Sequence, residues 1–473
     1  MSENHRAALQ QLNASIEADA HNLLTRFQRS MLHQLLAQPE QALADVQIAL
    51  ELEPHHPEVL NLRGTIYLDL KLPSKALADF QQASQHAPQY ATAFFNWGST
   101  LQSLGQLEDA IACFDQALAI EPQFVQALSN KGTALHALNR PNDALACYDQ
   151  ALMYSPDLPD VQWNKALSLL TLGDFKQGWP LYEYRWQTQG FMPRTLPSTR
   201  WLGETRLQGK RIHIYAEQGL GDTIQFLRYL RPLAQTGAII TLEVHSSLLS
   251  LAQKIPRIAQ VIALGERPPA CDVHCALMSL PLALGLHSPI SATELGAALQ
   301  ASSHHLALWN NRLGAKTKPR IGLVMHGNLR NEKDALRSIA APLWLKHLPP
   351  EFDYVLLHEH LSSSQREHFE TRENFHYFGD HITSFEDTAA LCQLMDVVVS
   401  VDTSVAHLSA SLGRPTWLVL PHAPDWRWQL ERTDSPWYAS MRLFRQTQAT
   451  QWTEALQSIA HELSRFLLLG DKI

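Results

Sequence analysis

Small, aromatic and proline positions repeat at a fixed spacing along the N-terminal part of the chain. Four series keep a period of 34 residues. They are Gly64, Gly98 and Gly132 continued by Ala166; Ala42, Ala76, Ala110 and Ala144; Pro54, Pro88, Pro122 and Pro156; and Phe80, Phe114, Tyr148 and Tyr182. These four series predict a repeated pair of helices. The small residues allow the two helices to pack closely, the aromatic ring fills the space between them, and the proline ends the second helix.

The hydrophobic pattern changes after about residue 187. A segment rich in Pro and Gly, residues 191–210, is typical of a linker. Apolar runs typical of strands then alternate with helical patterns. Strands are predicted at 211–216, 238–244, 320–327, 353–358, 396–402 and 416–420, and helices at about 222–235 and 451–468. Two such sets predict two doubly wound, Rossmann-like lobes built on parallel sheets.

The N-terminal period resembles the tetratricopeptide repeat over roughly residues 20–186. Ser30 stands where the first glycine is expected, as is common in a terminal repeat. The predicted fold class is α plus α/β, with a helical solenoid in residues 1–186 and lobes in 187–313 and 314–473. The concave face of the solenoid is expected to bind an extended peptide or a partner protein.

Composition narrows the class of protein. The formal net charge is −8 and no Lys/Arg-rich run occurs, which argues against nucleic-acid binding through phosphate neutralisation. No run reaches about 18 apolar residues, and the N-terminus lacks an apolar signal core. We therefore expect no integral membrane segment and a cytoplasmic location.

The cysteines are few and scattered. They are Cys113, Cys147, Cys271, Cys275 and Cys392. The stretch from Cys271 to Cys275, with His274, supplies three possible metal ligands, whereas structural zinc requires four well-spaced ones. We interpret these cysteines as packed thiols and predict neither disulfides nor a metal site.

The first loop that can carry chemistry, residues 217–222 (the Asp222 loop), has the sequence EQGLGD. Gly219 and Gly221 follow a predicted strand and precede a helix, so backbone amides there can approach a ligand. Asp222 is expected at the N-cap of that helix. Taken alone, this motif favours a simple capping role for Asp222, since Asp is a preferred N-cap residue.

The second loop, residues 401–407 (the Asp402 loop), joins a predicted strand to a helix that ends at Gly413. Free amides and the positive end of the dipole at such a helix start suit a diphosphate. An ordinary buried histidine is the alternative interpretation for His407. Three polar side chains meeting at one strand end favour a ligand site instead: Asp402, Ser404 and His407.

The segments DTSVAHLSASLGRPTWLVL and QGLGDTIQFLRYL resemble the paired motifs of the lipopolysaccharide heptosyltransferase superfamily of GT-B glycosyltransferases. Shorter pieces are similar too: WLGE (201–204), HCALMSLPLALG (274–285), RSI (337–339) and PDWRW (424–428). With the repeats, the chain resembles bacterial proteins that join tetratricopeptide repeats to a heptosyltransferase-like domain. It departs from them at Met325-His326-Gly327-Asn328 and in residues 329–336, where Arg337 is nevertheless kept.

The resemblance implies an inverting, metal-independent sugar transfer from a nucleotide-sugar, with no cofactor. Asp222 would remove the proton of the acceptor hydroxyl. The leaving diphosphate would be held by amides at Thr403, Ser404 and Val405 and by Arg337. Asp402 and His407 would orient the donor, next to Gly219, Gly221, Gly327 and Asn328.

Two tryptophans, Trp426 and Trp428, flank Arg427 two positions apart. In an extended segment they would share a face and could stack on the donor base or line the acceptor path. An equally good interpretation is a wall of the cleft between the lobes, and Trp426 and Arg427 are not included among the predicted ligand residues.

Three classes of function stay open. The first is glycosylation of a protein held by the repeats, supported by analogy with other repeat-bearing sugar transferases. The second is transfer to lipopolysaccharide or another glycan, with the repeats recruiting a partner. The third is a scaffold with an inactive transferase fold, which the survival of both loops argues against.

Overall fold

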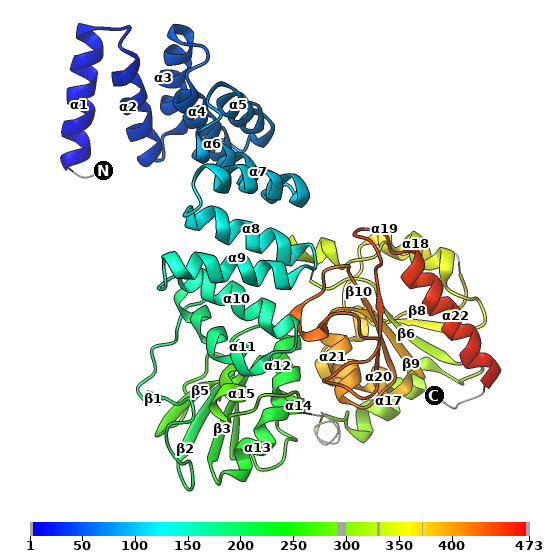
Figure 1. Cartoon of the computed structure of the whole chain (residues 1–473). Coiled ribbons are helices and arrows are strands. Elements are labelled where there is room, and N and C mark those ends of the chain that lie inside the picture. The colour runs from blue at the N-terminus through cyan, green and yellow to red at the C-terminus, as the bar shows by residue number, and fades with distance from the viewer. Residues whose placement is uncertain (1–2, 291–298, 329–331, 371, 470–473) are drawn as a thin grey trace. The chain divides into compact units, whose positions relative to one another are not determined.

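The computed structural model describes residues 3–290, 299–328, 332–370 and 372–469 (Figure 1). The chain forms two compact units, Met1–Ser168 and Leu169–Ile473. No helix among the described residues is both long enough and apolar enough to cross a bilayer.

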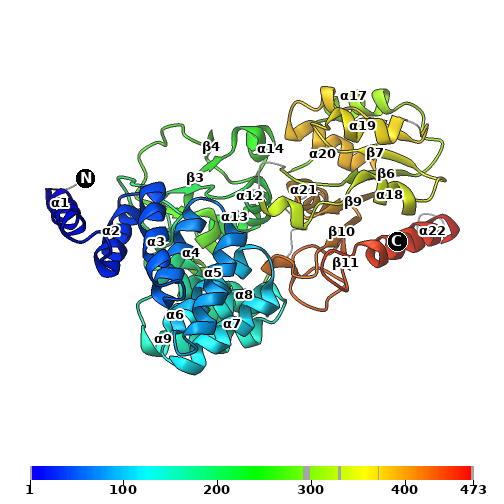
Figure 2. The same cartoon turned by 90° about the horizontal axis from the view of Figure 1, so that it is seen from above.

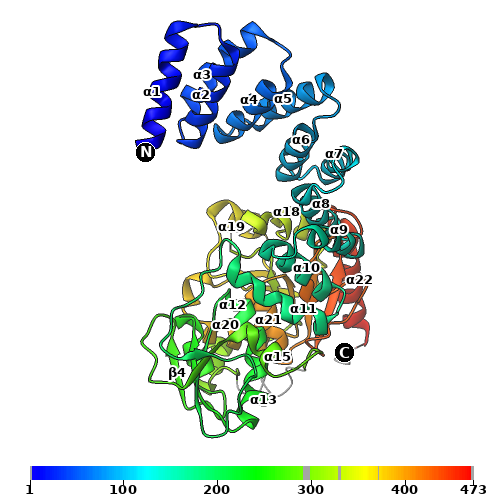
Figure 3. The ribbon, with the colours of Figure 1, turned by 60° about the vertical axis from the view of Figure 1, so that its left-hand side comes forward.

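The first unit is a series of helix hairpins (Figure 3). Its helices are α1 (Glu3–Ala18), α2 (Leu23–Leu35), α3 (Pro39–Leu52), α4 (Pro57–Asp69), α5 (Pro73–His86), α6 (Ala91–Ser103), α7 (Leu107–Ile120), α8 (Val125–Ala137), α9 (Pro141–Tyr154) and α10 (Pro159–Thr171), the last running into the second unit. The pairs α2/α3, α4/α5, α6/α7 and α8/α9 pack most closely. The predicted tetratricopeptide-type solenoid is thus confirmed, and α1 precedes the repeated pattern.

The glycines of the repeats leave space for the aromatic rings. A Cβ atom at Gly64 would lie 2.5 Å from the ring of Phe80, one at Gly98 2.8 Å from Phe114, and one at Gly132 2.5 Å from Tyr148. Such distances are impossible without displacing a packed ring. In the first repeat the buried Ser30 fits instead by donating its hydroxyl to the carbonyl oxygen of Ala42 at 2.8 Å. The 34-residue period therefore reflects helix-to-ring packing.

Prolines mark the ends of the repeated helices. Pro54, Pro88, Pro122 and Pro156 each lie two residues beyond the last residue of α3, α5, α7 or α9. Other prolines occupy the first turn of α3, α4, α5 and α9, where the missing N–H has no helical partner to lose.

The second unit begins with aromatic helix α11 (Phe175–Tyr182) and the short helix η1 (Glu183–Gln187), followed by a five-stranded sheet. The strands are β1 (Thr199–Arg200), β2 (Arg211–Tyr215), β3 (Ile239–Val244), β4 (Gln260–Ala263) and β5 (Val273–Ala276), in the order β1-β5-β2-β3-β4. All pairs are parallel. The helical connections are α12 (Leu220–Phe226), η2 (Leu227–Tyr229), α13 (Leu230–Gln235), η3 (Ser246–Leu248), α14 (Leu249–Ala252), η4 (Leu277–Ser279) and α15 (Leu280–Ala283).

A second, six-stranded sheet follows helix α17 (Ser303–Leu313). Its strands are β6 (Arg320–Val324), β7 (Asp353–Leu356), β8 (Phe375–Tyr377), β9 (Val397–Val401), β10 (Thr416–Leu420) and β11 (Met441–Arg445). The order β11-β10-β9-β6-β7-β8, parallel throughout, is that of a doubly wound nucleotide-binding sheet. The strand order reverses beside β2 in the first sheet and beside β6 in the second, and such a reversal opens a crevice at the carboxyl edge of a sheet.

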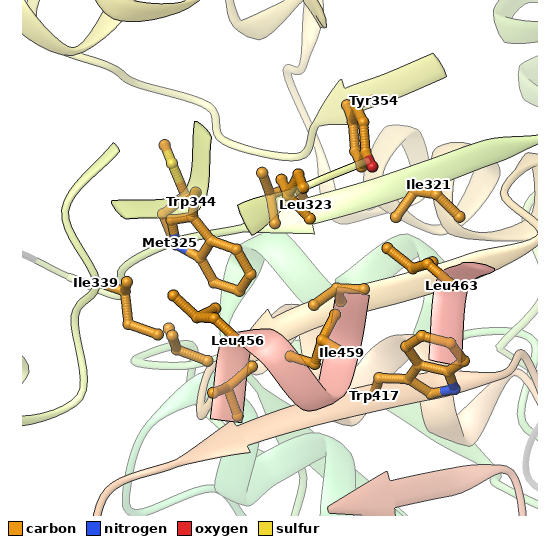
Figure 4. Close-up of a cluster of buried hydrophobic side chains, with 14 of the residues drawn as sticks. Ile321, Leu323, Met325, Ile339, Trp344, Tyr354, Trp417, Leu456, Ile459 and Leu463 are labelled. Carbon is orange, nitrogen blue, oxygen red and sulfur yellow. The ribbon is translucent and has the colours of Figure 1, made fainter. Parts of the chain in front are cut away.

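Helices lie on both faces of the second sheet (Figure 2). They include α18 (Ala341–His347), α20 (Phe385–Leu394), α21 (Ser404–Ser411) and α22 (Thr453–Leu469). The other helical segments of this part are η5 (Glu332–Leu336), α19 (Ser363–Glu370), η6 (Gly379–His381) and η7 (Trp426–Trp428). Figure 4 shows the core beneath one face, where Leu456, Ile459 and Leu463 of α22 meet Ile321 and Leu323 of β6. Spacings of three and four put the α22 residues on one helical face, and each buried side chain contributes roughly 1.5–3 kcal/mol.

Two details differ from the prediction. The helix predicted at 222–235 is broken into α12, η2 and α13, because Pro232 cannot donate a hydrogen bond and its ring clashes with the carbonyl four residues earlier. Five strands, β1, β4, β5, β8 and β11, were not predicted. β1 and β8, with two and three residues, are too short for a recognisable pattern, and β4, β5 and β11 contain polar residues that interrupt the apolar run.

Candidate active site

A cavity of about 1330 Å³ lies at the carboxyl ends of β2, β6, β7 and β9, between the two sheets of the second unit. Every residue predicted for the site lines it: Gly219, Gly221, Asp222, Gly327, Asn328, Arg337, Asp402, Thr403, Ser404, Val405 and His407. The structure therefore brings together two loops that are distant in sequence. Their individual roles remain predictions.

Asp222 is not the N-cap of α12, as was expected. Gly219 occupies the N-cap, and Asp222 is the third helical residue, from which its Oδ2 accepts the Gly219 N–H at 2.9 Å. A carboxylate reaching back from this position satisfies an amide that the helix leaves unpaired. The Asp222 side chain is 24% exposed and faces the cavity with part of its carboxylate.

The other oxygen of Asp222, Oδ1, accepts a charge-assisted hydrogen bond from Arg427 of η7. Arg427 is buried and also donates to Asp425 Oδ1 at 2.7 Å and to Gln225 Oε1 at 2.7 Å. Burial acts to lower the pKa of Arg427, but the carboxylates of Asp425 and Asp222 outweigh it and raise that pKa, so the guanidinium stays charged.

Gly221 is required for the contact between α12 and α21. A Cβ atom there would lie 2.9 Å from the ring of His407 and 3.6 Å from the Cα of Ser404. From the sequence, this glycine is expected to let a ligand approach the backbone closely. The structure adds a second reason, since only glycine lets the helix that carries Asp222 pack on the helix that carries His407.

The start of α21 offers backbone donors to the cavity. Thr403 is the N-cap, but it makes no side-chain cap; its hydroxyl pairs with the hydroxyl of Ser400 at 3.0 Å. The buried Ser400 thus takes up the hydroxyl that could otherwise accept a backbone N–H of α21. The first-turn amides at Ser404 and Val405 lie in the cavity wall without a side-chain cap, as an anion site requires.

Burial shifts the pKa values of Asp402 and His407 so that the neutral form of each side chain is favoured. Burial and the nearby carboxylate of Asp425 raise the pKa of Asp402 to about 6, although Trp428 Nε1 donates to its Oδ2 at 2.8 Å. Burial and the cations Arg427, Arg228 and Arg337 lower the pKa of His407 well below its ordinary value. His407 is therefore neutral; its Nδ1 lies 2.8 Å from the Tyr438 hydroxyl and its Nε2 3.8 Å from Asp402.

Arg337 is held beside the loop after β6. Its Nε donates to Asp334 Oδ1 at 2.8 Å, and Asp334 also accepts from the Gly327 N–H at 3.0 Å and the Ser338 hydroxyl at 2.7 Å. A Cβ atom at Gly327 would lie 2.5 Å from Asp334 and 2.7 Å from Arg337, which explains the glycine. Of the divergent stretch 329–336, residues 329–331 lie outside the described part of the chain.

His326, one of the residues that depart from the family pattern, packs against His358 with ring centroids 4.2 Å apart and the rings tilted by 30°, and both line the cavity. His358 Nε2 accepts the Met325 N–H at 2.9 Å. Burial, with a smaller effect of His326, lowers the pKa of His358 to about 3, so this imidazole is neutral.

Trp426 and Trp428 do not lie in extended chain, so the prediction of a shared face is wrong. They belong to the 3-10 helix η7, which Asp425 caps by accepting the Arg427 N–H at 3.0 Å. Trp426 packs edge-on against Trp179 of α11, with centroids 5.5 Å apart, and Trp428 stacks on His407 at 5.2 Å. Both rings are buried and support the cavity wall.

Several residues of the site were missed in the sequence. One is Glu217, which lines the cavity and accepts a hydrogen bond from Nη2 of the buried Arg185 at 2.9 Å. Burial raises the pKa of Glu217 to about 7, although the charge of Arg185 acts to lower it. Asp334 and Arg427 were missed as supports of Arg337 and Asp222. The signal for Arg427 in the sequence was its place in the PDWRW segment. No local pattern could pair it with Asp222, 205 residues away.

Cys275 is buried in β5, as predicted for a packed thiol, whereas Cys271 is partly exposed and donates to the Pro269 carbonyl.

Comparison with protein families gives matches in both units. Tetratricopeptide repeat models match residues 32–91, 91–124 and 132–183. The model of glycosyltransferase family 9 (heptosyltransferase) matches residues 382–445, which include the Asp402 loop and η7.

Among individual proteins, Protein FlbA of Caulobacter vibrioides is 26% identical over 333 residues, covering 64% of this chain and 54% of FlbA. The match thus spans about half of that relative. Similar solved structures include PilW, a type IV pilus biogenesis factor, at 24% identity and TM-score 0.37 over 41% of this chain and 88% of PilW. YrrB, a TPR protein with a peptide-binding site, matches at 18% identity and TM-score 0.33 over 38% of this chain and 92% of YrrB.

Proposed function

We propose that this chain, which joins tetratricopeptide repeats to a glycosyltransferase family 9 (heptosyltransferase) segment, is an inverting, metal-independent transferase that moves a sugar from a nucleotide-sugar to a hydroxyl acceptor. The two parallel sheets would be the lobes of a GT-B enzyme, spanning residues 187–313 and 314–473 after a repeat domain in 1–186.

One observation carries the proposal. The carboxylate of Asp222 and the uncapped first turn of α21 line the same cavity, and Gly221 holds their helices in contact. A proton acceptor and an anion-binding helix end on one cavity are what transfer from a nucleoside diphosphate sugar requires.

In the proposed reaction, the acceptor oxygen attacks the anomeric carbon while Asp222 takes its proton. The bond from that carbon to the phosphate oxygen breaks on the opposite side, and the nucleoside diphosphate leaves with the electron pair. The α21 amides, the helix dipole and Arg337 stabilise the negative charge of the leaving group. Neutral His407 and the carboxyl of Asp402 orient the sugar and phosphates of the donor.

We propose a protein as the acceptor, presented by the repeats, because solenoids of this type commonly bind extended peptides or partner proteins. A lipopolysaccharide or other glycan acceptor is the second candidate, with the repeats recruiting a partner. A third candidate is a scaffold whose transferase unit is inactive.

A screen of nucleotide-sugars by thermal unfolding tests the donor site. A ligand at 100 times its dissociation constant adds about 2.7 kcal/mol of stability, and a true donor should also be consumed when an acceptor is present. A mass increase of one sugar on a co-expressed protein supports a protein acceptor, and a modified glycan supports the second candidate. Binding without transfer or hydrolysis contradicts an active enzyme and favours the scaffold.

A further inference from the structure

We infer that Arg427 is a positioning residue, which orients the Asp222 carboxylate for proton removal and so makes the base of the first lobe depend on contact with the second lobe. This inference rests on the proposed function, in which Asp222 is the base.

One face of α12 and η2 is turned toward the second lobe. Asp222, Gln225 and Arg228 follow one another at intervals of three, which places them on the same side of a helix. Asp222 and Gln225 both accept from Arg427, and Arg228 donates to the carbonyl oxygen of Trp437. On this face two buried arginines therefore bridge the lobes, and of these two Arg427 is the one that contacts the base.

Arg427 has the geometry of a rigid fork. Its Nη2, Nη1 and Nε donate to Asp222, Asp425 and Gln225 respectively, and its side chain is 6% exposed. Its own N–H binds Asp425, and its carbonyl oxygen accepts from Trp437 Nε1 at 2.7 Å. A planar guanidinium satisfies three acceptors in fixed directions, whereas the ammonium of lysine cannot.

The two bonds to Asp222 fix how its carboxylate is rotated. Oδ2 is held by the Gly219 N–H of its own loop and Oδ1 by Arg427 of the other lobe. Each oxygen keeps a further lone pair for an acceptor hydroxyl. If the lobes separate, only the Gly219 contact remains and the carboxylate can rotate away from the position that proton removal requires.

Asp425 completes the arrangement. When Asp222 takes the acceptor's proton it becomes neutral, and a buried arginine without a counter-charge would be costly. Asp425 still pairs with Arg427 in that state, so the protonated base is tolerated.

The test compares Arg427→Met, Asp222→Asn and the double variant in steady-state transfer, with donor affinity measured by calorimetry. We expect Arg427→Met to lower kcat about 10- to 100-fold and to change donor affinity less than threefold. If Arg427 acts through Asp222, the double variant should be no slower than Asp222→Asn alone. Multiplied effects in the double variant, or a tenfold loss of donor affinity in Arg427→Met, would overturn the inference.

Arg228→Met is the matched control, since Arg228 is also buried between the lobes but does not contact Asp222. Its effect on kcat should multiply with that of Asp222→Asn. If Arg427→Met does not fold, Gln225→Met replaces it in the test, because it removes one acceptor of Arg427 at similar side-chain volume. We expect Gln225→Met to lower kcat about three- to tenfold, and to lower it no further when Asp222→Asn is already present. An unchanged kcat in Gln225→Met would then refute the positioning role. Wild-type turnover in Asp222→Asn would instead reject Asp222 as the base. Failure of the proposed function can thus be told apart from failure of the positioning role of Arg427.

Discussion

The two units differ in how far apart along the chain their packing partners lie. In the repeat unit, Gly132 makes room for Tyr148, sixteen residues later, and the other repeats copy this contact. In the second unit, Gly221 makes room for His407 and Asp222 pairs with Arg427, 205 residues further on. Local and periodic contacts leave a pattern in the sequence, whereas contacts between lobes leave none.

Apart from loss of the base itself, the largest expected effect concerns the distant contact. Gly221→Ala should lower transfer by about 100-fold, because its Cβ would lie 2.9 Å from the buried ring of His407 and push α12, with Asp222, away from α21. Gly219→Ala is the comparison, since there the Cβ meets only the end of the Asp222 side chain at 3.2 Å. Wild-type turnover in Gly221→Ala would show that the α12–α21 contact has no role in the reaction.

This contrast explains which parts could be predicted from the sequence. The solenoid followed from its period, and four main strands of the second sheet followed from apolar runs. Of the residues that line the cavity, those of the Asp222 and Asp402 loops were found through their motifs, and Gly327, Asn328 and Arg337 through the family resemblance. The bonds that hold them were not. The bond from Arg427 to Asp222 joins residues 205 positions apart, which no local pattern encodes. The Gly219–Asp222 and Ser400–Thr403 bonds each span three residues, and there the sequence allows more than one capping arrangement.

A smaller effect is expected in the repeats, on stability alone. Gly132→Val should destabilise the repeat unit by about 1–3 kcal/mol, because the added atoms collide with the ring of Tyr148. In a double-mutant cycle, Tyr148→Ala should absorb most of that penalty. Additive losses in chemical denaturation would mean that the glycine period does not reflect this packing.

The last expected effect is a change in stability that appears only as the pH is varied, and Asp402 is its source. Burial is the main cause that raises the pKa of this carboxyl from its ordinary value of 3.8 to about 6 in the folded protein. A carboxyl raised in this way stabilises the fold fully below its unfolded pKa, and that stabilisation is lost as pH rises through about 6. The free energy of unfolding of Asp402→Asn, relative to that of the wild type, should therefore rise by on the order of 1–3 kcal/mol between pH 4 and pH 8. Parallel stability curves for the two proteins would argue against a strained Asp402.

The central claim, that Asp222 is the base of a sugar transferase, is tested most directly by the turnover of Asp222→Asn with a donor identified by thermal unfolding. Asparagine keeps an acceptor for the Gly219 N–H, and Asp425 still pairs with Arg427, so the fold and donor affinity should be preserved. The proposal predicts turnover lower by about 10² to 10⁴ with nearly unchanged donor binding. Turnover close to that of the wild type would contradict it and leave Asp222 with only a structural role at the start of α12.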